Sequence, residues 1–245
     1  MKLVTSDQMR AIDRDATQQR GIHSSTLMEN AGREIADRIL KDVLDSSSQK
    51  HIAVFCGKGN NGGDGLVVAR YLHLAGAQVE VWFLGPLEQL SPDARLNFEA
   101  AAGSGVQLHQ ILSVTDIPAQ LKHDLVIDAV FGTGFSGAPN GVATHLIDFI
   151  NEQDVPVVAV DLPSGLNADS GAHAGNVVRA DFTYTLALPK YGLFVTPGRE
   201  LAGLVSVVPI GIPDESIASV GLQCELITPE FVASALPTRK PDGHK

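Results

Sequence analysis

The sequence predicts an α/β protein whose central sheet is mostly parallel and is covered by helices on both faces. Short apolar stretches typical of buried strands alternate along the chain with stretches of helical periodicity. A glycine-rich loop joins the first such strand to the helix that follows it, as in a βα unit. Two further helical patterns precede the first strand, so we expect two helices before the sheet begins.

The two leading helices are indicated by apolar spacing and by candidate capping residues. Ser6 or Asp7 is the expected cap of the first helix, and Ser24 or Ser25 that of the second. The apolar stripes consist of Met9, Ile12 and Ala16 in the first helix and of Met28, Ala31, Ile35, Ile39 and Val43 in the second. Residues 45–50 are expected to form the loop into the first strand.

The remaining elements alternate between strand and helix. The first strand covers residues 51–55, and after a glycine loop a helix is expected to begin at Gly65. The later predicted strands are residues 78–84, 106–109, 125–130, 155–161, 180–188 and 204–209, and the later predicted helices are residues 92–102 and 142–151. Such alternation implies parallel strands joined by helices that cover both faces.

Composition limits the classes of function. The chain has 245 residues, of which 44% are hydrophobic, and this is enough for a sizeable core. A net charge of −10 without a basic face argues against non-specific nucleic-acid binding. We find no membrane-spanning apolar run and no secretory signal core, so no membrane partner is expected. The two cysteines, Cys56 and Cys224, do not make a disulfide framework and suit a reducing compartment, so we predict a cytoplasmic protein.

The glycine-rich loop predicts a nucleotide-like ligand. It contains five glycines between Cys56 and Gly65, which let the backbone approach a ligand near the N–H groups of a helix start. Its polar residues, Asn60, Asn61 and Asp64, supply oxygen atoms and amide groups rather than the positively charged side chains that bind phosphate. The loop therefore favours hydroxyl groups, amides or a bound cation as its ligands.

A dehydrogenase site is an alternative interpretation of the same loop. Gly57, Gly59 and Gly62 fit the GxGxxG pattern, and Glu80 lies near the spacing expected for a ribose-binding acid. Glu80 falls inside its predicted strand, however, and Asp64 places a negative charge where a phosphate would bind.

Four predicted strands are followed by loops rich in glycine and polar residues. Because the carboxyl ends of parallel strands lie at one edge of a sheet, we expect the polar residues of these loops to meet in one cleft. These residues are Asn60, Asn61, Asp64, Asp128, Asp161, Ser164 and Lys190. Each alone fits an ordinary role, such as a helix cap for Asp64 or a buried, hydrogen-bonded carboxylate for Asp128. Their joint presence at one edge favours a functional site.

Four motifs together resemble the NAD(P)H-hydrate epimerase family. They are GNNGGDG at 59–65, DAVFGTGFSG at 128–137, VDLPSGLNADSG at 160–171 and LALPKYGL at 186–193. The resemblance covers nearly the whole chain and implies a Rossmann-like three-layer sandwich. It also implies an isomerase of nicotinamide cofactor repair, which interconverts the R and S forms of hydrated NADH and NADPH. These hydrates carry a hydroxyl group on C6 of the nicotinamide ring.

The resemblance also implies which residues bind the substrate and a metal ion. The substrate-binding residues would be Asn60, Asn61, Gly62, Gly63, Asp64, Gly132, Thr133, Gly134, Phe135, Ser136, Gly137, Ala138 and Asp161. A potassium ion would be held at Asn61, Asp128 and Ser164, whose oxygen atoms suit a hard cation.

Asp161 and Lys190 are the predicted catalytic residues. Epimerisation at C6 requires the hydroxyl group to leave and water to return on the other face, through a cationic iminium. That route needs a proton donor for the departing oxygen and negative charge near the cation. Asp161 can supply the charge and relay the proton, while Lys190 can tune the pKa of Asp161 or donate to the leaving hydroxyl group. How the two residues divide these roles is left open by the sequence.

The domain prediction separates residues 1–235, the epimerase domain, from residues 236–245. The latter are polar, basic and interrupted by proline, and they resemble the opening of the ADP-dependent dehydratase domain that follows the epimerase in bifunctional bacterial proteins. Fusion to an ADP- or ATP-dependent hydrate dehydratase is therefore expected, and the resemblance also suggests a homodimer. Two other classes stay open: an NAD(P)-dependent dehydrogenase and a non-enzymatic scaffold of Rossmann-like fold.

Overall fold

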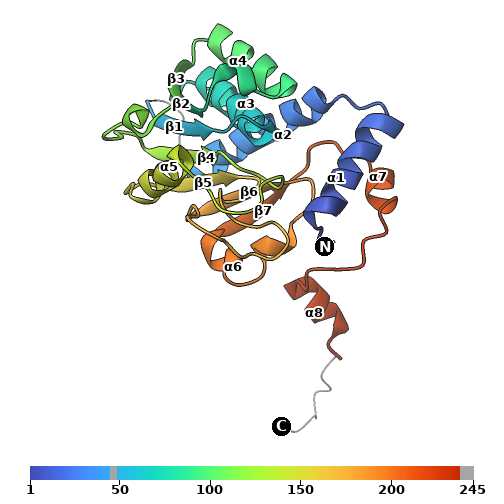
Figure 1. The fold of residues 1–245 in the computed structure, drawn as a ribbon. Coiled ribbons are helices and arrows are strands. Elements are labelled where there is room, and N and C mark those ends of the chain that lie inside the picture. The colour runs from blue at the N-terminus through green and yellow to red at the C-terminus, as the bar shows by residue number, and fades with distance from the viewer. Residues whose placement is uncertain (45–48, 238–245) are drawn as a thin grey trace, which may run out of the picture.

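The computed structural model describes residues 1–44 and 49–237, and in these residues seven strands form one sheet (Figure 1). All neighbouring strands are parallel. Their order is β3-β2-β1-β4-β5-β6-β7, and their bounds are β1 His51–Cys56, β2 Gln78–Leu84, β3 Gln107–Ile111, β4 Leu125–Ala129, β5 Val157–Val160, β6 Phe182–Leu186 and β7 Leu204–Val208. The predicted α/β fold is confirmed. Successive strands are added toward one edge of the sheet from β1 to β3 and toward the other edge from β4 to β7, so the order of strands reverses between β1 and β4.

The helices alternate with these strands. They are α1 Ser6–Arg14, α2 Ser24–Arg38, α3 Asn60–Leu74, α4 Pro92–Gly103, α5 Val142–Asn151, α6 Gly198–Leu201, α7 Asp214–Ala218 and α8 Pro229–Ala235. π-Helical turns at Asp15–Gln19 and Ile39–Val43 extend α1 and α2, and 3₁₀ turns occupy Leu87–Gln89, Val114–Asp116 and Tyr191–Leu193. Over the described ranges, no helix combines the length and the apolar character that crossing a bilayer requires.

Side chains of β1 alternate between two core layers. Ile52, Val54 and Cys56 pack in the cluster that includes α2, α3 and α4, whereas Ala53 and Phe55 pack in the cluster that includes α5. All five are completely buried. Burial on both faces explains why this strand is a continuous apolar run in the sequence. It also raises the pKa of the Cys56 thiol, as expected for a structural rather than a reactive cysteine.

The predicted element boundaries agree with the structure within a few residues, except at α3. This helix begins at Asn60 and not at Gly65. Asp64 therefore lies in the second turn of the helix, and the suggestion that Asp64 caps it was wrong. Glycines are poor helix formers, so their run at the start of α3 concealed the helix from pattern analysis.

Close packing explains why α3 keeps its glycines. A Cβ atom on Gly62 would lie 1.8 Å from the backbone oxygen of Gly57, and one on Gly65 would lie 2.4 Å from the Cβ atom of Ala129. A Cβ atom on Gly63 would lie 2.6 Å from Met28 Sδ. The first turns of α3 are thereby pressed against β4, the loop after β1 and α2.

The predicted caps of the two leading helices were also wrong. Thr5 caps α1 in a reciprocal capping box with Gln8, and His23 precedes α2. Ser6 has a different partner, because its N–H and its hydroxyl group donate to Asp169 at 2.5 and 2.8 Å. The predicted apolar stripe of α1 is nevertheless confirmed, since Met9, Ile12 and Ala16 are all buried.

Helix α1 lies outside the two helical layers, beside α7 (Figure 1). The segment before it pairs with the chain that follows β6. The N–H of Val4 donates to the oxygen of Pro189 at 3.0 Å, and the N–H of Tyr191 donates to the oxygen of Val4 at 3.2 Å. Residues 45–48 of the predicted first loop and residues 238–245 of the predicted linker fall outside the described residues.

Candidate active site

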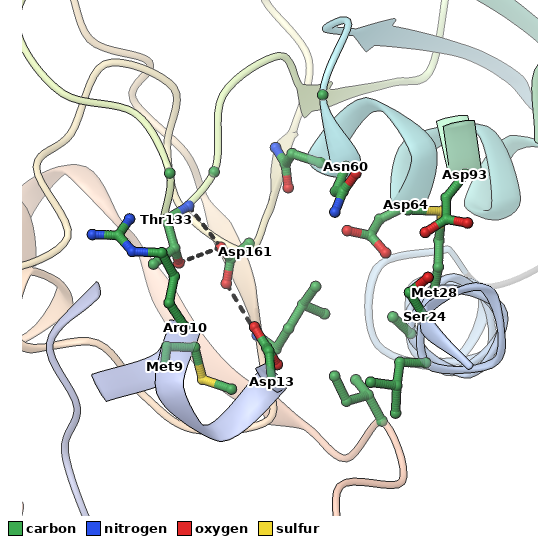
Figure 2. Close-up of a pocket in the computed structure, with 18 of the residues that line it drawn as sticks. Met9, Arg10, Asp13, Ser24, Met28, Asn60, Asp64, Asp93, Thr133 and Asp161 are labelled. Atoms are coloured by element: carbon green, nitrogen blue, oxygen red, sulfur yellow. Dashed lines mark hydrogen bonds between the residues drawn. The ribbon is translucent and has the colours of Figure 1, made fainter. Parts of the chain in front are cut away.

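A cavity of about 590 Å³ opens where β1, β4, β5 and β6 end (Figure 2). The loops after these strands form one wall, and α1, α2 and α4 contribute the others. The predicted site residues that line it are Asn60, Asn61, Asp64, Gly132, Thr133, Gly134, Phe135, Asp161 and Lys190. The structure therefore brings together polar residues from four separate loops, as the argument from the sheet edge anticipated.

Other predicted residues lie away from the cavity surface. Gly62 lies against the backbone of Gly57 and Gly63 lies against Met28, and the absence of a side chain at both positions permits this close packing. Asp128 and Ser164 are completely buried and do not line the cavity. The remaining residues of the second loop that lie outside the cavity lining are Ser136, Gly137 and Ala138.

Asp161 and Lys190 form an ion pair in the cavity wall. Lys190 Nζ donates to Asp161 Oδ1 at 2.6 Å, and the N–H and hydroxyl groups of Thr133 donate to Asp161 Oδ2 at 2.9 and 2.6 Å. Burial alone would raise the pKa of Asp161, but Lys190 and Thr133 outweigh it and hold the pKa below its ordinary value. Asp161 is thus a carboxylate at neutral pH.

Lys190 uses all three of its ammonium protons within the protein. Besides Asp161, it donates to the oxygen of Leu186 at 2.7 Å and to Thr185 Oγ1 at 3.3 Å. Only 1% of its surface is exposed. The ammonium group is therefore fixed in position and fully coordinated.

The backbone at Asp161 is strained. Its φ of 67° is in the left-handed region, which few residues other than glycine and asparagine adopt. Ala187, just after β6, has a φ of 59°. One strained residue thus belongs to the Asp161–Lys190 pair and the other precedes Lys190 by three positions, and strained backbone of this kind is concentrated at functional sites.

Asp128 and Ser164 form a hydrogen-bonded unit beneath the cavity. Ser164 donates its N–H to Asp128 Oδ2 at 2.8 Å and its hydroxyl group to Asp128 Oδ1 at 2.6 Å. Burial raises the pKa of Asp128 to about 6, although these hydrogen bonds oppose the shift. Within the described residues no cationic side chain pairs with this carboxylate.

Asn61 has a buried amide group without a hydrogen-bond partner in the described part of the chain. Its amide lies against Gly132, where a Cβ atom would be 3.0 Å from Asn61 Oδ1 and 3.1 Å from Asp161 Oδ2. A buried amide without a partner is costly, so a ligand that engages it would be favoured. Asn61 has an amide oxygen, Asp128 a carboxylate and Ser164 a hydroxyl group, and oxygen ligands of these kinds fit a hard monovalent cation.

Comparison with known proteins decides the family. The profile of the family described as YjeF-related protein N-terminus matches residues 24–192. The NAD(P)H-hydrate epimerase of Oenococcus oeni is 38% identical over 209 residues, which are 85% of this chain and 96% of that protein. The NAD(P)H-hydrate epimerase of Elusimicrobium minutum is 35% identical over 90% of this chain and 100% of its own length. The chain belongs to the NAD(P)H-hydrate epimerase family.

Longer relatives and a solved structure agree with this family. The bifunctional NAD(P)H-hydrate repair enzyme Nnr of Moorella thermoacetica is 44% identical over 100% of this chain, which spans about half (47%) of that relative. The crystal structure of yeast YNL200c has a TM-score of 0.73, with 24% identity, over 91% of this chain and 95% of that one. At that identity the yeast structure supports the fold alone.

The cavity is also lined by Met9, Arg10 and Asp13 of α1 and by Thr17 of the π-helical turn that follows it, and none of these was among the predicted site residues. Met9, Asp13 and Thr17 are spaced four apart, so they share one face of the leading helix. Figure 2 shows Asp13 pointing from α1 toward Asp161. In the sequence, Asp13 lies directly beside the apolar stripe that contains Ile12 and Ala16. That position alone does not distinguish Asp13 from an ordinary surface aspartate.

Burial and mutual repulsion change the charges of the acidic residues in the cavity. Burial raises the pKa of Asp13 to about 6, assisted by Asp161 and opposed by Lys190. Burial also raises the pKa of Asp64 well above its ordinary value, and the charges of Asp161 and Asp13 add to this. Burial therefore disfavours the negative charge that the sequence position of Asp64 suggested at the start of α3.

Glu80, the acid of the alternative dehydrogenase interpretation, lies within β2. It is not part of the cavity wall. Its carboxylate instead lies 3.7 Å from His109 Nε2 and 3.9 Å from His123 Nε2. It is therefore not at the strand end, where a ribose contact is normally made.

Proposed function

We propose that this chain catalyses the interconversion of the R and S forms of hydrated NADH and NADPH. The observation that carries the proposal is the buried Asp161–Lys190 pair in the cavity wall of a chain from the epimerase family. Asp161 offers a fixed negative charge to a cation that forms in the cavity. A site of this kind favours a reaction that passes through a short-lived cationic intermediate.

The hydrate is proposed to bind with its ring beside Asp161 and its pyrophosphate near the start of α3. The N–H groups of Asn60, Asn61 and Gly62 precede the first intrahelical hydrogen bond, which Gly63 donates to Gly59. Free N–H groups at a helix start are suited to anions. The raised pKa of Asp64 supports this placement, because burial favours its uncharged form, which repels phosphate less than a carboxylate does.

The proposed reaction begins with departure of the C6 hydroxyl group as water. The electron pair of the ring nitrogen forms a C=N bond as the C6–O bond breaks, which gives a cationic iminium. The Asp161 carboxylate stabilises that cation in a site of low dielectric constant. Water then adds to the opposite face of C6, and the electron pair returns to the ring nitrogen. No hydride moves, so the cofactor is not oxidised.

Potassium is proposed to bind at Asn61, Asp128 and Ser164. The support is the unpartnered amide of Asn61 and the buried carboxylate of Asp128, which together form an oxygen-only donor set. A bound cation would supply positive charge that offsets the acidic residues and helps to hold an anionic cofactor.

We also propose that residues 1–235 form an epimerase domain that is joined to a hydrate dehydratase in the parent protein. Support comes from the bifunctional relatives, which align with this whole chain over about half of their length. The parent gene tests the proposal, because an open frame that runs into an ADP- or ATP-dependent dehydratase is expected. A stop codon directly after Lys245 would contradict it.

The epimerase proposal is tested by mixing the protein with the purified R-hydrate of NADH. Appearance of the S-hydrate is followed by chromatography, and a sample without protein gives the spontaneous rate. We expect faster equilibration with the protein and no loss of reduced nicotinamide. Equal rates in the two samples would reject the proposal. Oxidation of a hydroxy acid with intact NAD would instead indicate a dehydrogenase.

A further inference from the structure

The carboxyl group of Asp13 differs from that of Asp161, although both line the cavity. Asp161 accepts hydrogen bonds from Lys190 and from two groups of Thr133. In residues 1–44 and 49–237, no group donates a hydrogen bond to the Asp13 carboxyl. Asp13 is partly buried and points toward Asp161 (Figure 2). It is therefore an acidic group with free oxygen atoms at the place where the substrate ring is proposed to bind.

The position of Asp13 is tied to the backbone of Lys190. Val4 pairs in parallel with Lys190, and Ser6 at the start of α1 is held by Asp169. From these anchors α1 carries Met9 and Asp13 along the cavity on one helical face. The same segment that contacts the chain of Lys190 thus places a second carboxyl group opposite it.

The hydrogen bonds of the site leave few proton donors for a departing hydroxyl group. Lys190 has committed its three protons to Asp161, Leu186 and Thr185. Asp161 is held as a carboxylate by its donors. Asp161 therefore has no proton to give, and Lys190 cannot release one to the substrate without breaking a hydrogen bond of this network.

Asp13 has the protonation behaviour that a general acid needs. Burial and the charge of Asp161 raise its pKa to about 6, while Lys190 opposes the shift. A catalytic acid works best when its pKa lies near the working pH. Arg10 of α1, which is paired with Asp7 at 2.6 Å, and Asp64 of α3 also line the cavity. Lys58 and Asp93 are the further charged residues of its lining.

We propose that Asp13 is the general acid–base residue of this site, which rests on the proposed epimerase function. The carboxyl group of Asp13 gives its proton to the C6 hydroxyl oxygen, and the C6–O bond breaks with both electrons going to that oxygen, which leaves as water. When water adds to the other face, the protonated hydroxyl group on C6 loses one proton. That proton returns to the Asp13 carboxylate through water in the cavity, so no other reactant is consumed.

The test compares Asp13→Asn, Asp13→Glu and the control Asp37→Asn in R-to-S conversion over a pH series. Asp37 is exposed on α2 and does not line the cavity, so its variant makes the same charge change elsewhere. We expect Asp13→Asn to lower kcat by about 10²–10⁴ with little change in KM. The decline of wild-type kcat/KM above pH 6 should disappear in Asp13→Asn, and Asp13→Glu should restore both activity and the decline. Asp37→Asn should behave as the wild type.

Several outcomes would overturn the proposal. An Asp13→Asn variant with near-normal kcat, or one that keeps the wild-type pH decline, would show that Asp13 is not the general acid. Loss of that decline in Asp64→Asn but not in Asp13→Asn would assign the acid to Asp64. If Asp13→Asn does not fold, Asp13→Ala takes its place, and a wild-type pH decline that persists in Asp13→Ala has the same consequence. Absence of epimerisation by the wild type would instead reject the proposed function, so the two failures are distinguishable.

Discussion

Lys190 Nζ lies 2.6 Å from Asp161 Oδ1, with side-chain exposures of only 1% and 8%. No other ion pair of the described residues is as enclosed. Removing one partner of such a pair leaves an unpaired buried charge. The pair therefore contributes both to the stability of the fold and to the chemistry of the cavity. Substitutions of Asp161 and of Lys190 should show its effect on turnover and its effect on stability separately.

We predict that Asp161→Asn loses turnover while the protein still folds. Asparagine tolerates the φ of 67° at this position better than most residues, and it keeps the shape of the side chain. Loss of the carboxylate removes the charge that stabilises the iminium, so kcat should fall about 10²-fold or more. Steady-state kinetics and circular dichroism check this prediction. An asparagine variant with near-normal kcat would exclude Asp161 from the mechanism.

We predict that Lys190→Met destabilises the protein because it leaves the Asp161 carboxylate buried without its partner. The expected loss is about 3–5 kcal/mol in the free energy of unfolding, measured by denaturant titration. The matched control is the double variant Asp161→Asn/Lys190→Met, in which no unpaired charge is left. It should recover part of the lost stability. Additive losses in the double variant would show that the two charges do not interact.

We predict that potassium chloride raises the melting temperature more than choline chloride at equal ionic strength, since only the folded state holds the cation site. Asn61→Ala should abolish the difference. The Asn61 amide has no partner among the described residues, so its removal costs no hydrogen bond there and the stability in choline should be preserved. Equal melting temperatures in both salts for the wild type would contradict the proposed site.

The glycines of the first loop allow a test of packing. A Cβ atom on Gly62 would lie 1.8 Å from a backbone oxygen, whereas one on Gly59, the N-cap of α3 with a φ of −89°, would meet no atom within 4 Å. We therefore predict that Gly62→Ala lowers the free energy of unfolding by more than about 1–3 kcal/mol. Gly59→Ala should change it little. Similar denaturation midpoints for the two variants would show that the close approach at Gly62 can relax.

The central strands could be predicted from the sequence because they are buried on both faces of the sheet. Ile52 to Cys56 is an apolar run for that reason, and Leu125 to Ala129 is apolar apart from Asp128. The shared edge then predicted the meeting of Asp161 and Lys190, which are 29 positions apart. Once the strands are predicted to be parallel, the residues at their carboxyl ends are expected to lie close together even when they are distant in the sequence.

The contribution of α1 could not be predicted in this way. Asp13 reaches the cavity because Val4 pairs with the chain at Lys190, a contact between segments from opposite ends of the sequence. Nothing in the local pattern around either residue encodes that pairing. The early start of α3 was missed for a different reason, since packing against Gly57 and Met28 overrides the low helix propensity of its glycines.

The raised pKa of Asp13 makes a prediction about stability that needs no substrate. The folded pKa of about 6 lies above the ordinary value of 3.8, so the folded state binds this proton more tightly than the unfolded state. The contribution of Asp13 to stability is therefore fully present below pH 4 and is lost as the pH rises to about 6. At pH 7.5, Asp13→Asn should exceed the wild type in free energy of unfolding by on the order of 1–3 kcal/mol.

Denaturant titrations of the wild type and Asp13→Asn at pH 4, 5, 6 and 7.5 check this prediction. The difference between the two proteins should be small at pH 4 and should grow up to about pH 6, while the other carboxyl groups titrate in both proteins and largely cancel. Asp37→Asn, the exposed control, should follow the wild type at every pH. A stability difference that does not vary with pH would mean that the Asp13 carboxyl titrates alike in the folded and unfolded states, and the proton assigned to it would then have to reside elsewhere.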